Sequence, residues 1–450
     1  MFFKKQDDDL FISKKELKDY NKKYSEPYDS VKNDGENNMI LSQNIRLGLD
    51  YRKTDRNQNV FCIGGAGTGT SRGFIQPNIL QANSSFVIND PGGNLYYDYK
   101  EFLENEGYKI KTLNLINTKN SNHYNPFNYI QDEEDVKKLV DCIIYYEDSI
   151  SKRTCDRFWE DSEKALLQAL MFYLIKYRPK EEQNFNSILK LLSKASIDEN
   201  DPDFESPLDK IFKQVEKNDP QDITIKQYKT FKEVAGKSFK GILISVSVHL
   251  SIFNISEIIN LTQEDNIELE KLGDEKTALF VITPTADDTY NFLTSIIYKQ
   301  LFTTLYNHAE KEYIPSRLPY HVQFLLNDFE NMGQIPEFEK IIATMRPYNI
   351  SCSIITQHIL QIKEIYNLEE IRGNCDTLLF FGSANEEVLK YIENLLSGSL
   401  NINSSELFSM NNEDLIIMIR GINPFKDKKF LSLEQHINYN KYIQSIDNDN

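Results

Sequence analysis

The sequence predicts an α/β protein in which helices cover both faces of a mostly parallel sheet and an all-helical domain is inserted into that sheet. Three observations predict it. A short apolar strand runs into a glycine-rich loop at residues 59–72, strands alternate with helices up to residue 128 and again from residue 276, and helical periodicity alone fills the stretch between. Strands and helices alternate in parallel sheets because parallel neighbours need a long crossover connection.

Eight segments are expected as strands, which gives a sheet of seven or eight strands. Residues 108–115 alternate apolar and polar side chains, whereas 277–283 are almost continuously apolar, a pattern typical of strands buried on both faces. A helix stopped by Gly107 and another over 289–308 are expected between strands. The expected strands are 59–63, 86–90, 108–115, 277–283, 321–328, 351–357, 377–382 and 414–420.

Between residues 129 and 272 the alternation stops, and only helical periodicity remains. Leu166, Leu170, Tyr173 and Tyr177 fall on one stripe of a helix over 156–177. Further helices are expected over 187–195, 207–215, 225–234 and 238–250. We therefore predict an inserted all-helical domain over residues 129–272.

The remaining boundaries follow from composition. Residues 1–50 are charged, polar and weakly periodic, and we expect a loosely packed N-terminal extension. The nucleotide-binding domain is expected to be discontinuous, over 51–128 and 273–437, because strands need only meet in space. Residues 438–450 form a polar tail that is expected to fray.

Composition excludes several classes of function. The chain has 450 residues and a net charge of −17, which argues against a generally basic nucleic-acid coat. Its five cysteines include no CxxC pair and its six histidines no metal-ligand spacing, so a reducing cytoplasm and no metal framework are expected. The chain has no apolar run of membrane-spanning length, so we expect no transmembrane segment in it.

The glycine-rich loop is the main candidate site. It fits the phosphate-binding pattern GxxxxGK[ST] at Gly64, Gly69 and Ser71, with Thr70 in the place of the lysine. Backbone N–H groups of such a loop cradle phosphates without help from side chains. A plain glycine-rich turn and a dinucleotide fingerprint are the alternatives, and the second needs a third glycine where Thr70 stands. The candidate nucleotide-binding residues here are Gly64, Gly65, Gly67, Gly69, Thr70, Ser71 and Arg72.

Several motifs in fixed order suggest a family. They are 59–71, 76–83, 90–94, 124–127, 158–160, 324–336, 343–346, 353–357 and 373–376. Together they resemble the TraG/TraD-type coupling proteins of type IV secretion and conjugation, in their Gram-positive branch, over about residues 41 to 429. The resemblance implies a RecA-like P-loop NTPase core and a hexameric ATPase, tethered by N-terminal membrane helices, that delivers a relaxase–DNA complex to a secretion channel.

The chain differs from this family at the residues that bind and hydrolyse the nucleotide. The family has lysine at the position of Thr70, an Asp-Pro-Lys-Gly-Glu motif where this chain has Asp90-Pro-Gly-Gly-Asn94, and an Asp-Glu pair where it has Asn327 and Asp328. The resemblance adds Asp90 to the nucleotide-binding candidates and implies that Ser71 and Asn327 face Mg²⁺, which neutral oxygens would hold weakly. ATP and Mg²⁺ are therefore possible cofactors of doubtful affinity.

The same resemblance assigns the candidate catalytic residues Asp328, Asn327, Gln357 and Arg346. Gln357 occupies the strand end that senses the γ-phosphate, and a helix-start cap is the alternative. Arg346 matches an arginine offered across a subunit boundary, and a surface salt bridge is the alternative. Arg72 is a possible substitute for the missing lysine, although it is expected to point along its helix.

The expected loss of rate at these positions favours an impaired enzyme. Losing one preorganised group that stabilises transition-state charge costs about 10²–10³ in rate, and two or three such losses bring turnover near the uncatalysed level. We therefore predict little or no ATP hydrolysis and a role in nucleotide or partner binding. The alternatives are an active hexameric DNA-translocating ATPase with non-standard site residues and the decaying product of a mobile element.

The expected partners follow from the resemblance. They are relaxase or relaxosome components, type IV secretion components, DNA through the helical domain, and a homo-hexamer or a mixed oligomer with an intact paralogue. The membrane anchor of relatives is not found in this sequence, so we expect a cytoplasmic protein that partners recruit to the inner face of the membrane. Two local features are interpreted conservatively: Arg52, Lys53 and Arg56 as a solvated surface, and Trp159 as a core anchor instead of a base-stacking platform.

Overall fold

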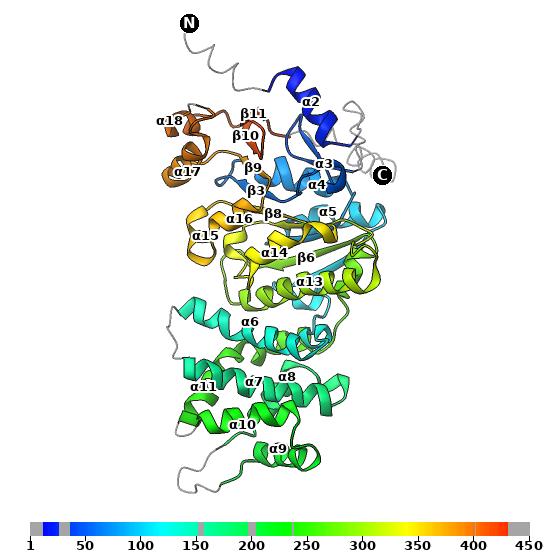
Figure 1. Ribbon diagram of the computed structural model, residues 1–450, viewed down its shortest axis with the longest axis vertical. Coiled ribbons are helices and arrows are strands. Elements are labelled where there is room, and N and C mark those ends of the chain that lie inside the picture. The colour runs from blue at the N-terminus through cyan, green and yellow to red at the C-terminus, as the bar shows by residue number, and fades with distance from the viewer. Residues whose placement is uncertain are drawn as a thin grey trace.

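The structure is a computed structural model that describes residues 12–26, 37–151, 157–196, 204–235, 238–400 and 402–430. In these residues a nine-stranded sheet lies above an elongated lobe of helices (Figure 1). The strands of the sheet are β3 (Val60–Ile63), β4 (Ser85–Pro91), β5 (Lys109–Asn114), β6 (Thr277–Thr283), β7 (Val322–Leu326), β8 (Ile350–Thr356), β9 (Thr377–Phe380), β10 (Asp414–Ile419) and β11 (Phe425–Lys428).

The strand order is β11-β10-β9-β3-β8-β7-β4-β6-β5. Every neighbouring pair from β9 to β5 is parallel, and β10 pairs antiparallel with both β9 and β11. All eight expected strands are present. The expected strand number was too low because β11, with the sequence Phe-Lys-Asp-Lys, has too few apolar residues to mark it as a strand.

Alternate side chains of the strands inside the sheet enter two different cores. In β3, Phe61 and Ile63 join one apolar cluster, and Val60 and Cys62 join the other. This is the period-2 geometry of a strand buried on both faces. The helices that pack on the sheet are α4 (Gln76–Leu80), α5 (Asn94–Asn105), α13 (Asn291–Glu312), α14 (Phe338–Thr344), α15 (Ile359–Ile365), α16 (Leu368–Gly373) and α17 (Glu386–Leu396), and α18 (Ser404–Phe408) follows them in the chain. Helices α13 to α17 contribute to the first cluster, and α4 and α5 to the second.

The inserted segment folds as the helical lobe in the lower half of Figure 1. Its helices are α6 (Glu133–Ser151), α7 (Arg157–Tyr177), α8 (Phe185–Leu192), α9 (Pro207–Asn218), α10 (Ile223–Ala235), α11 (Phe239–His249) and α12 (Ser256–Thr262). Trp159 packs against the core, and its ring approaches Gly241 so closely that a Cβ there would lie 2.8 Å from it. The core-anchor interpretation of Trp159 is therefore confirmed.

The expectation of loose packing over residues 1–50 is wrong for residues 38–49. Strands β1 (Asn38–Ile40) and β2 (Arg46–Gly48) pair as an antiparallel hairpin whose Met39 and Leu47 are buried. The backbone of Ile40 exchanges hydrogen bonds of 2.8 and 2.9 Å with the side chain of Asn78. The sequence did not predict this hairpin, because strands of three residues are too short to show an alternating apolar pattern. Helices α2 (Lys14–Tyr24) and α3 (Tyr51–Thr54) flank the hairpin.

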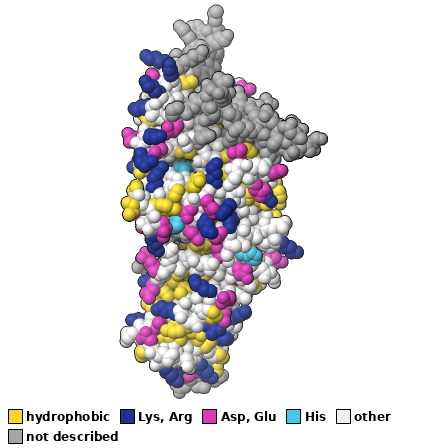
Figure 2. Space-filling model, turned by 90° about the vertical axis from the view of Figure 1, so that its right-hand side faces the viewer, with side chains coloured by type: hydrophobic (Ala, Val, Ile, Leu, Met, Phe, Trp, Pro, Cys, Tyr) yellow, Lys and Arg dark blue, Asp and Glu magenta, His cyan; other side chains and the backbone are white. Residues whose placement is uncertain are grey.

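Charged side chains of both signs lie on the visible surface. On the face shown in Figure 2, Lys and Arg side chains lie interspersed with Asp and Glu side chains over both halves of the molecule. In the part of the chain that the structure describes, no helix is both long and apolar enough to cross a membrane.

Candidate nucleotide-binding site

The glycine loop follows β3 at the carboxyl edge of the sheet. Two backbone hydrogen bonds fix its first residues, from Gly64 N to Thr356 O (3.1 Å) and from Gly65 N to Gly382 O (2.9 Å). Gly67 and Gly69 adopt φ values of +75° and +88°, which favour glycine. The loop conformation therefore needs the glycines at these positions, as a phosphate-binding loop does.

Thr70 leans back over the start of the loop. A Cβ placed on Gly64 would lie 2.4 Å from the Thr70 methyl carbon, so the threonine side chain occupies the space directly above that glycine. Ser71, half-buried, begins a turn of π-helix over Ser71–Ile75 that leads into α4, and Arg72 is exposed. The side chain at position 70 thus brings no charge to the loop.

The end of β7 brings two predicted residues together. Asp328 has a left-handed backbone (φ +50°), and its Oδ1 accepts a 2.9 Å hydrogen bond from Nε2 of Gln357. Gln357 directly follows β8, which lies between β3 and β7. The N-cap of α15 is His358, and the Gln357 side chain bonds Asp328 instead. Asn327 is half-buried, and its backbone oxygen accepts a 2.6 Å hydrogen bond from the Asn89 side chain.

Sequence reasoning missed Glu330, a buried carboxylate beside this pair. Its Oε1 accepts hydrogen bonds from the backbone N–H groups of Gln357 (2.9 Å) and His358 (3.2 Å), whereas Oε2 has no hydrogen-bond partner in the described structure. Burial raises the pKa of Glu330, and the nearby Asp328 adds to the shift. Glu330 could have been predicted from the sequence, because it stands two residues after Asp328 at a polar strand end.

Asp90 is not brought to the glycine loop. It lies on β4, which β7 and β8 separate from β3. Its carboxylate accepts hydrogen bonds from the backbone N–H groups of Leu95 (3.1 Å) and Tyr96 (2.8 Å), and so stabilises the first turn of α5. Burial raises the pKa of Asp90 to about 6.

Arg346 also lies away from the loop of its own chain. It is exposed and precedes β8, at the edge of the sheet opposite Gln357. Its guanidinium lies 5.2 Å from the centre of the Tyr51 ring, and that of Arg317 lies 5.4 Å from the same ring. Among the described residues Arg346 forms no salt bridge. Arg346 and Gln357 therefore lie at opposite ends of β8, and Arg346 is not brought to the glycine loop of its own chain.

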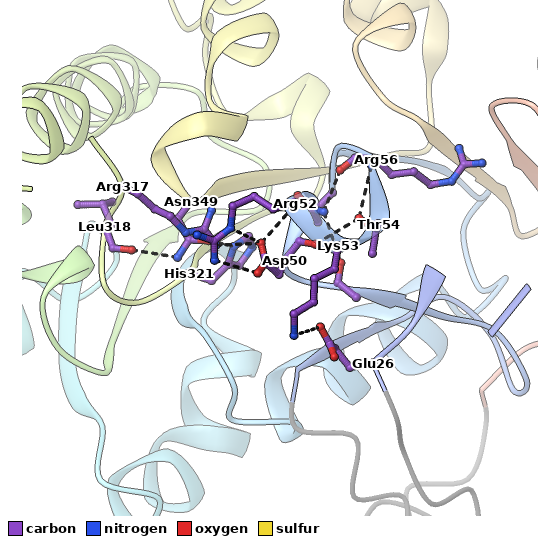
Figure 3. A network of polar contacts seen from close by, with 12 residues as sticks. Glu26, Asp50, Arg52, Lys53, Thr54, Arg56, Arg317, Leu318, His321 and Asn349 are labelled. Atoms are coloured by element: carbon purple, nitrogen blue, oxygen red, sulfur yellow. Dashed lines mark hydrogen bonds and ion pairs between the residues drawn. The ribbon is translucent and has the colours of Figure 1, made fainter. Parts of the chain in front are cut away.

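The neighbouring basic residues form hydrogen bonds within the chain (Figure 3). Arg52 makes two hydrogen bonds of 2.9 Å to Asp50, and Lys53 bonds Glu26 at 2.8 Å. Arg56 is buried and donates to the backbone oxygen of Arg420 at 2.6 Å. The solvated-surface interpretation holds for the exposed Arg52 and Lys53 and is wrong for Arg56, which packs over the Tyr24 ring at 4.2 Å.

A glycine loop after β3, with polar strand ends beside it in a parallel sheet, defines a RecA-like P-loop NTPase fold carrying a helical domain. Residues 6–405 match the family model described as type IV secretory system conjugative DNA transfer, and the chain belongs to that family. A sequence comparison with curated proteins gives no significant match.

Solved structures with the same fold include two of the plasmid coupling protein TrwB. The complex with the non-hydrolysable ATP analogue ADPNP has a TM-score of 0.66 at 13% identity, over 94% of this chain and 93% of that one. The complex with ADP and Mg²⁺ has a TM-score of 0.61 at 12% identity, over 94% of both chains. VirB4 of Thermoanaerobacter pseudethanolicus has a TM-score of 0.51 at 15% identity, over 88% of this chain and 97% of that one.

Proposed function

We propose that this chain is a coupling-protein homologue that binds a nucleoside triphosphate at its glycine loop and hydrolyses it little or not at all. The observation that carries the proposal is the position of Thr70, whose uncharged side chain folds over Gly64 in a loop that otherwise keeps phosphate-binding geometry. The role then falls on nucleotide or partner binding. That TrwB is seen with ADPNP and with ADP and Mg²⁺ supports the choice of ligand.

Magnesium fits this site only weakly. The hydroxyl of Ser71 and the amide oxygen of Asn327 are neutral ligands, and Mg²⁺ prefers carboxylates and phosphate oxygens. When bound, the ion would neutralise charge on the β- and γ-phosphates. The described residues contain no group of three or more His, Cys, Asp or Glu side chains that could hold a metal. Ser71 and Asn327 would therefore be weak ligands of an ion held mainly by the nucleotide phosphates.

The catalytic side of the site is also weakened. In the implied mechanism a carboxylate after the strand orients the attacking water, but the Asp328 carboxylate already accepts a hydrogen bond from Gln357. Aspartate is also one methylene shorter than the glutamate of the family. Each lost group lowers the rate of ATP hydrolysis by about 10²–10³-fold. The effects of groups that act together are not additive, but the combined loss remains large.

One observation favours the alternative, an active hexameric DNA-translocating ATPase. Glu330 places a second carboxylate beside Gln357, with one oxygen that the described residues leave unpaired. That oxygen could orient water if the Glu330 carboxyl were ionised. Burial opposes this because it raises the pKa of the carboxyl. A decaying gene product is disfavoured because the strands of the sheet keep unbroken apolar cores.

Partners and location complete the proposal. Membership of a conjugative DNA transfer family supports relaxase or relaxosome components and type IV secretion components as partners, with DNA meeting the helical lobe. Arg346, exposed at the edge away from its own loop, supports a homo-hexamer or a mixed oligomer with an intact paralogue. Such partners would recruit a cytoplasmic chain to the inner face of the membrane.

The test is to measure binding and hydrolysis together. We expect the purified chain to bind a fluorescent ATP analogue, and to release phosphate in the presence of DNA far below the median enzyme turnover of about 10 s⁻¹. Gly69→Val, which strains a backbone at φ +88°, is the negative control for binding. Turnover near the median would establish the active alternative, and no binding to the unmodified chain would refute the nucleotide site.

A further inference from the structure

Lys429, which directly follows β11, is buried against the glycine loop. Only 2% of its surface is exposed. Its ammonium group donates hydrogen bonds to the backbone oxygens of Thr68 (2.9 Å) and Phe381 (2.7 Å) and lies 3.5 Å from Oδ1 of Asn412. Thr68 and Lys429 are 361 residues apart in the sequence. A cation from the C-terminal edge of the sheet is thus attached to the phosphate-binding loop.

This ammonium has no anionic partner in the described structure. The neighbouring Lys426 and Lys428 both pair with Asp414, at 3.6 and 2.6 Å, whereas no ion pair of Lys429 is found among the described residues. The groups that the ammonium contacts directly are neutral oxygens and the Phe381 ring, whose centre lies 5.3 Å away, and Asp414 acts on it only from beyond ion-pair distance. A buried charge is costly unless it is paired, so an anion bound nearby would be stabilised by this group.

The contacts of Lys429 also shape the loop. Thr68 Oγ1 donates a 2.7 Å hydrogen bond to Gly65 O, and Gly65 N donates to Gly382 O at 2.9 Å. Lys429 closes this set of contacts because it bonds both Thr68, in the loop, and Phe381, just after β9. The ammonium bonds carbonyl oxygens of the loop, so it acts on a ligand through the loop and through its charge.

We propose that Lys429 is a positioning residue that supplies the glycine loop with the positive charge absent at Thr70 and holds the loop ready for a phosphate. The inference rests on the proposed binding of a nucleoside triphosphate at this loop. With this charge, a loop that has Thr70 in place of a lysine would still favour anions electrostatically.

The first experiment compares charge at two positions. In the full chain, Lys429→Met is expected to weaken the affinity for a fluorescent ATP analogue about tenfold or more, the size of a lost charged hydrogen-bond partner. Lys428→Met removes a charge one residue away, from a side chain that is 43% exposed, and is the matched control. Adding Thr70→Lys to Lys429→Met is expected to restore affinity, which a purely structural role of Lys429 would not allow.

The second experiment uses pH. Burial lowers the pKa of Lys429 to about 8, while Asp414 on β10 and the Cys62 thiol on β3 are the titratable groups that oppose the shift. Affinity of the unmodified chain is therefore expected to fall as pH rises through 8. The Thr70→Lys, Lys429→Met chain should keep its affinity to higher pH, because an exposed lysine titrates near 10.4.

The outcomes separate the two proposals. If the unmodified chain binds nucleotide and Lys429→Met binds it equally well, the role of Lys429 is refuted and the proposed function stands. If Lys429→Met binds poorly and Thr70→Lys does not rescue it, Lys429 is a structural support only, and the inference is again refuted. If the unmodified chain binds no nucleotide at any pH, both proposals fail.

Discussion

Gln357 donates a 2.9 Å hydrogen bond from Nε2 to Oδ1 of Asp328, and this bond joins the ends of two strands beside the glycine loop. Gln357 follows β8 and Asp328 follows β7, which are neighbours in the parallel sheet. The same glutamine is held through its backbone by Glu330. Gln357 is therefore fixed through its side chain by Asp328 and through its backbone by Glu330.

Restoring the family residues should restore hydrolysis. We expect Thr70→Lys, Asn327→Asp and Asp328→Glu together to raise ATP turnover by at least about 10²-fold, because they return phosphate neutralisation, a metal ligand and a longer water-orienting carboxylate. Phosphate release with DNA present is the measurement. The control replaces Thr70→Lys by Thr70→Met, which has similar bulk and no charge. If turnover does not change, the defect lies outside these three positions.

The bond between Asp328 and Gln357 should contribute to stability. Alanine at each position and at both forms a double-mutant cycle in which we expect a coupling of roughly 1 kcal/mol, since one partner is charged but both are only half-buried. Urea unfolding of the four chains gives the coupling. Asp328→Ala combined with Lys213→Ala on α9, at the far end of the helical lobe, should be additive (Figure 1). A coupling indistinguishable from that control would show that the bond is not formed in solution.

Arg346 should act on a site in another chain. We expect a chain with the three restoring substitutions to lose its hydrolysis when Arg346→Ala is added, and to regain it when mixed with the unmodified chain, which keeps Arg346. The reason is that this arginine lies at the edge opposite its own Gln357. Mixing with an otherwise unmodified Arg346→Ala chain is the control and should restore nothing. Full activity of the Arg346→Ala chain alone would contradict the assignment.

His321 should make the protein less stable in weak acid. It is buried between Asn349 and Ser351, and burial together with Arg317 lowers its pKa to about 4 (Figure 3). The unfolded chain takes up a proton near pH 6.5 and the folded chain only near 4, so the free energy of unfolding falls as pH falls between these values, by roughly 3 kcal/mol at most.

The variant His321→Gln keeps polar groups at this position and does not titrate. Its denaturant midpoint should therefore depend less on pH between 4 and 6.5 than that of the unmodified chain. His358→Gln, at an exposed position, is the control and should leave the slope unchanged. Equal slopes for all three chains would show that His321 titrates normally in the folded state.

The sequence predicted those parts of the molecule whose signal is local. Strand β6 was predictable because seven consecutive buried residues leave an apolar run, and α7 because its periodicity persists over 21 residues. The loop after β3 was predictable from glycine spacing alone. Strand β11 and the hairpin of β1 and β2 were not predicted, because short strands with polar residues gain their burial from neighbours distant in the sequence.

The same limit applies to the site. Gln357 and Asp328 were singled out by the family resemblance, which places both at strand ends, and the structure brings them into contact. The contact of Lys429 with the loop could not be predicted, because Lys429 and Thr68 are 361 residues apart in the sequence. Asp90 was included from a motif, but the backbone N–H groups of α5 that occupy its carboxylate are set by the local turn.

The first apolar cluster extends from the sheet into the helical lobe. It continues through α13 into the helical lobe, and includes Val87 of β4, Leu301 of α13 and Leu170 of α7. Hinge bending between sheet and lobe would open this shared interior to water, at roughly 25 cal/mol for each Å² exposed. Any movement that nucleotide binding drives is therefore expected to displace the sheet and the helical lobe together, as one rigid body.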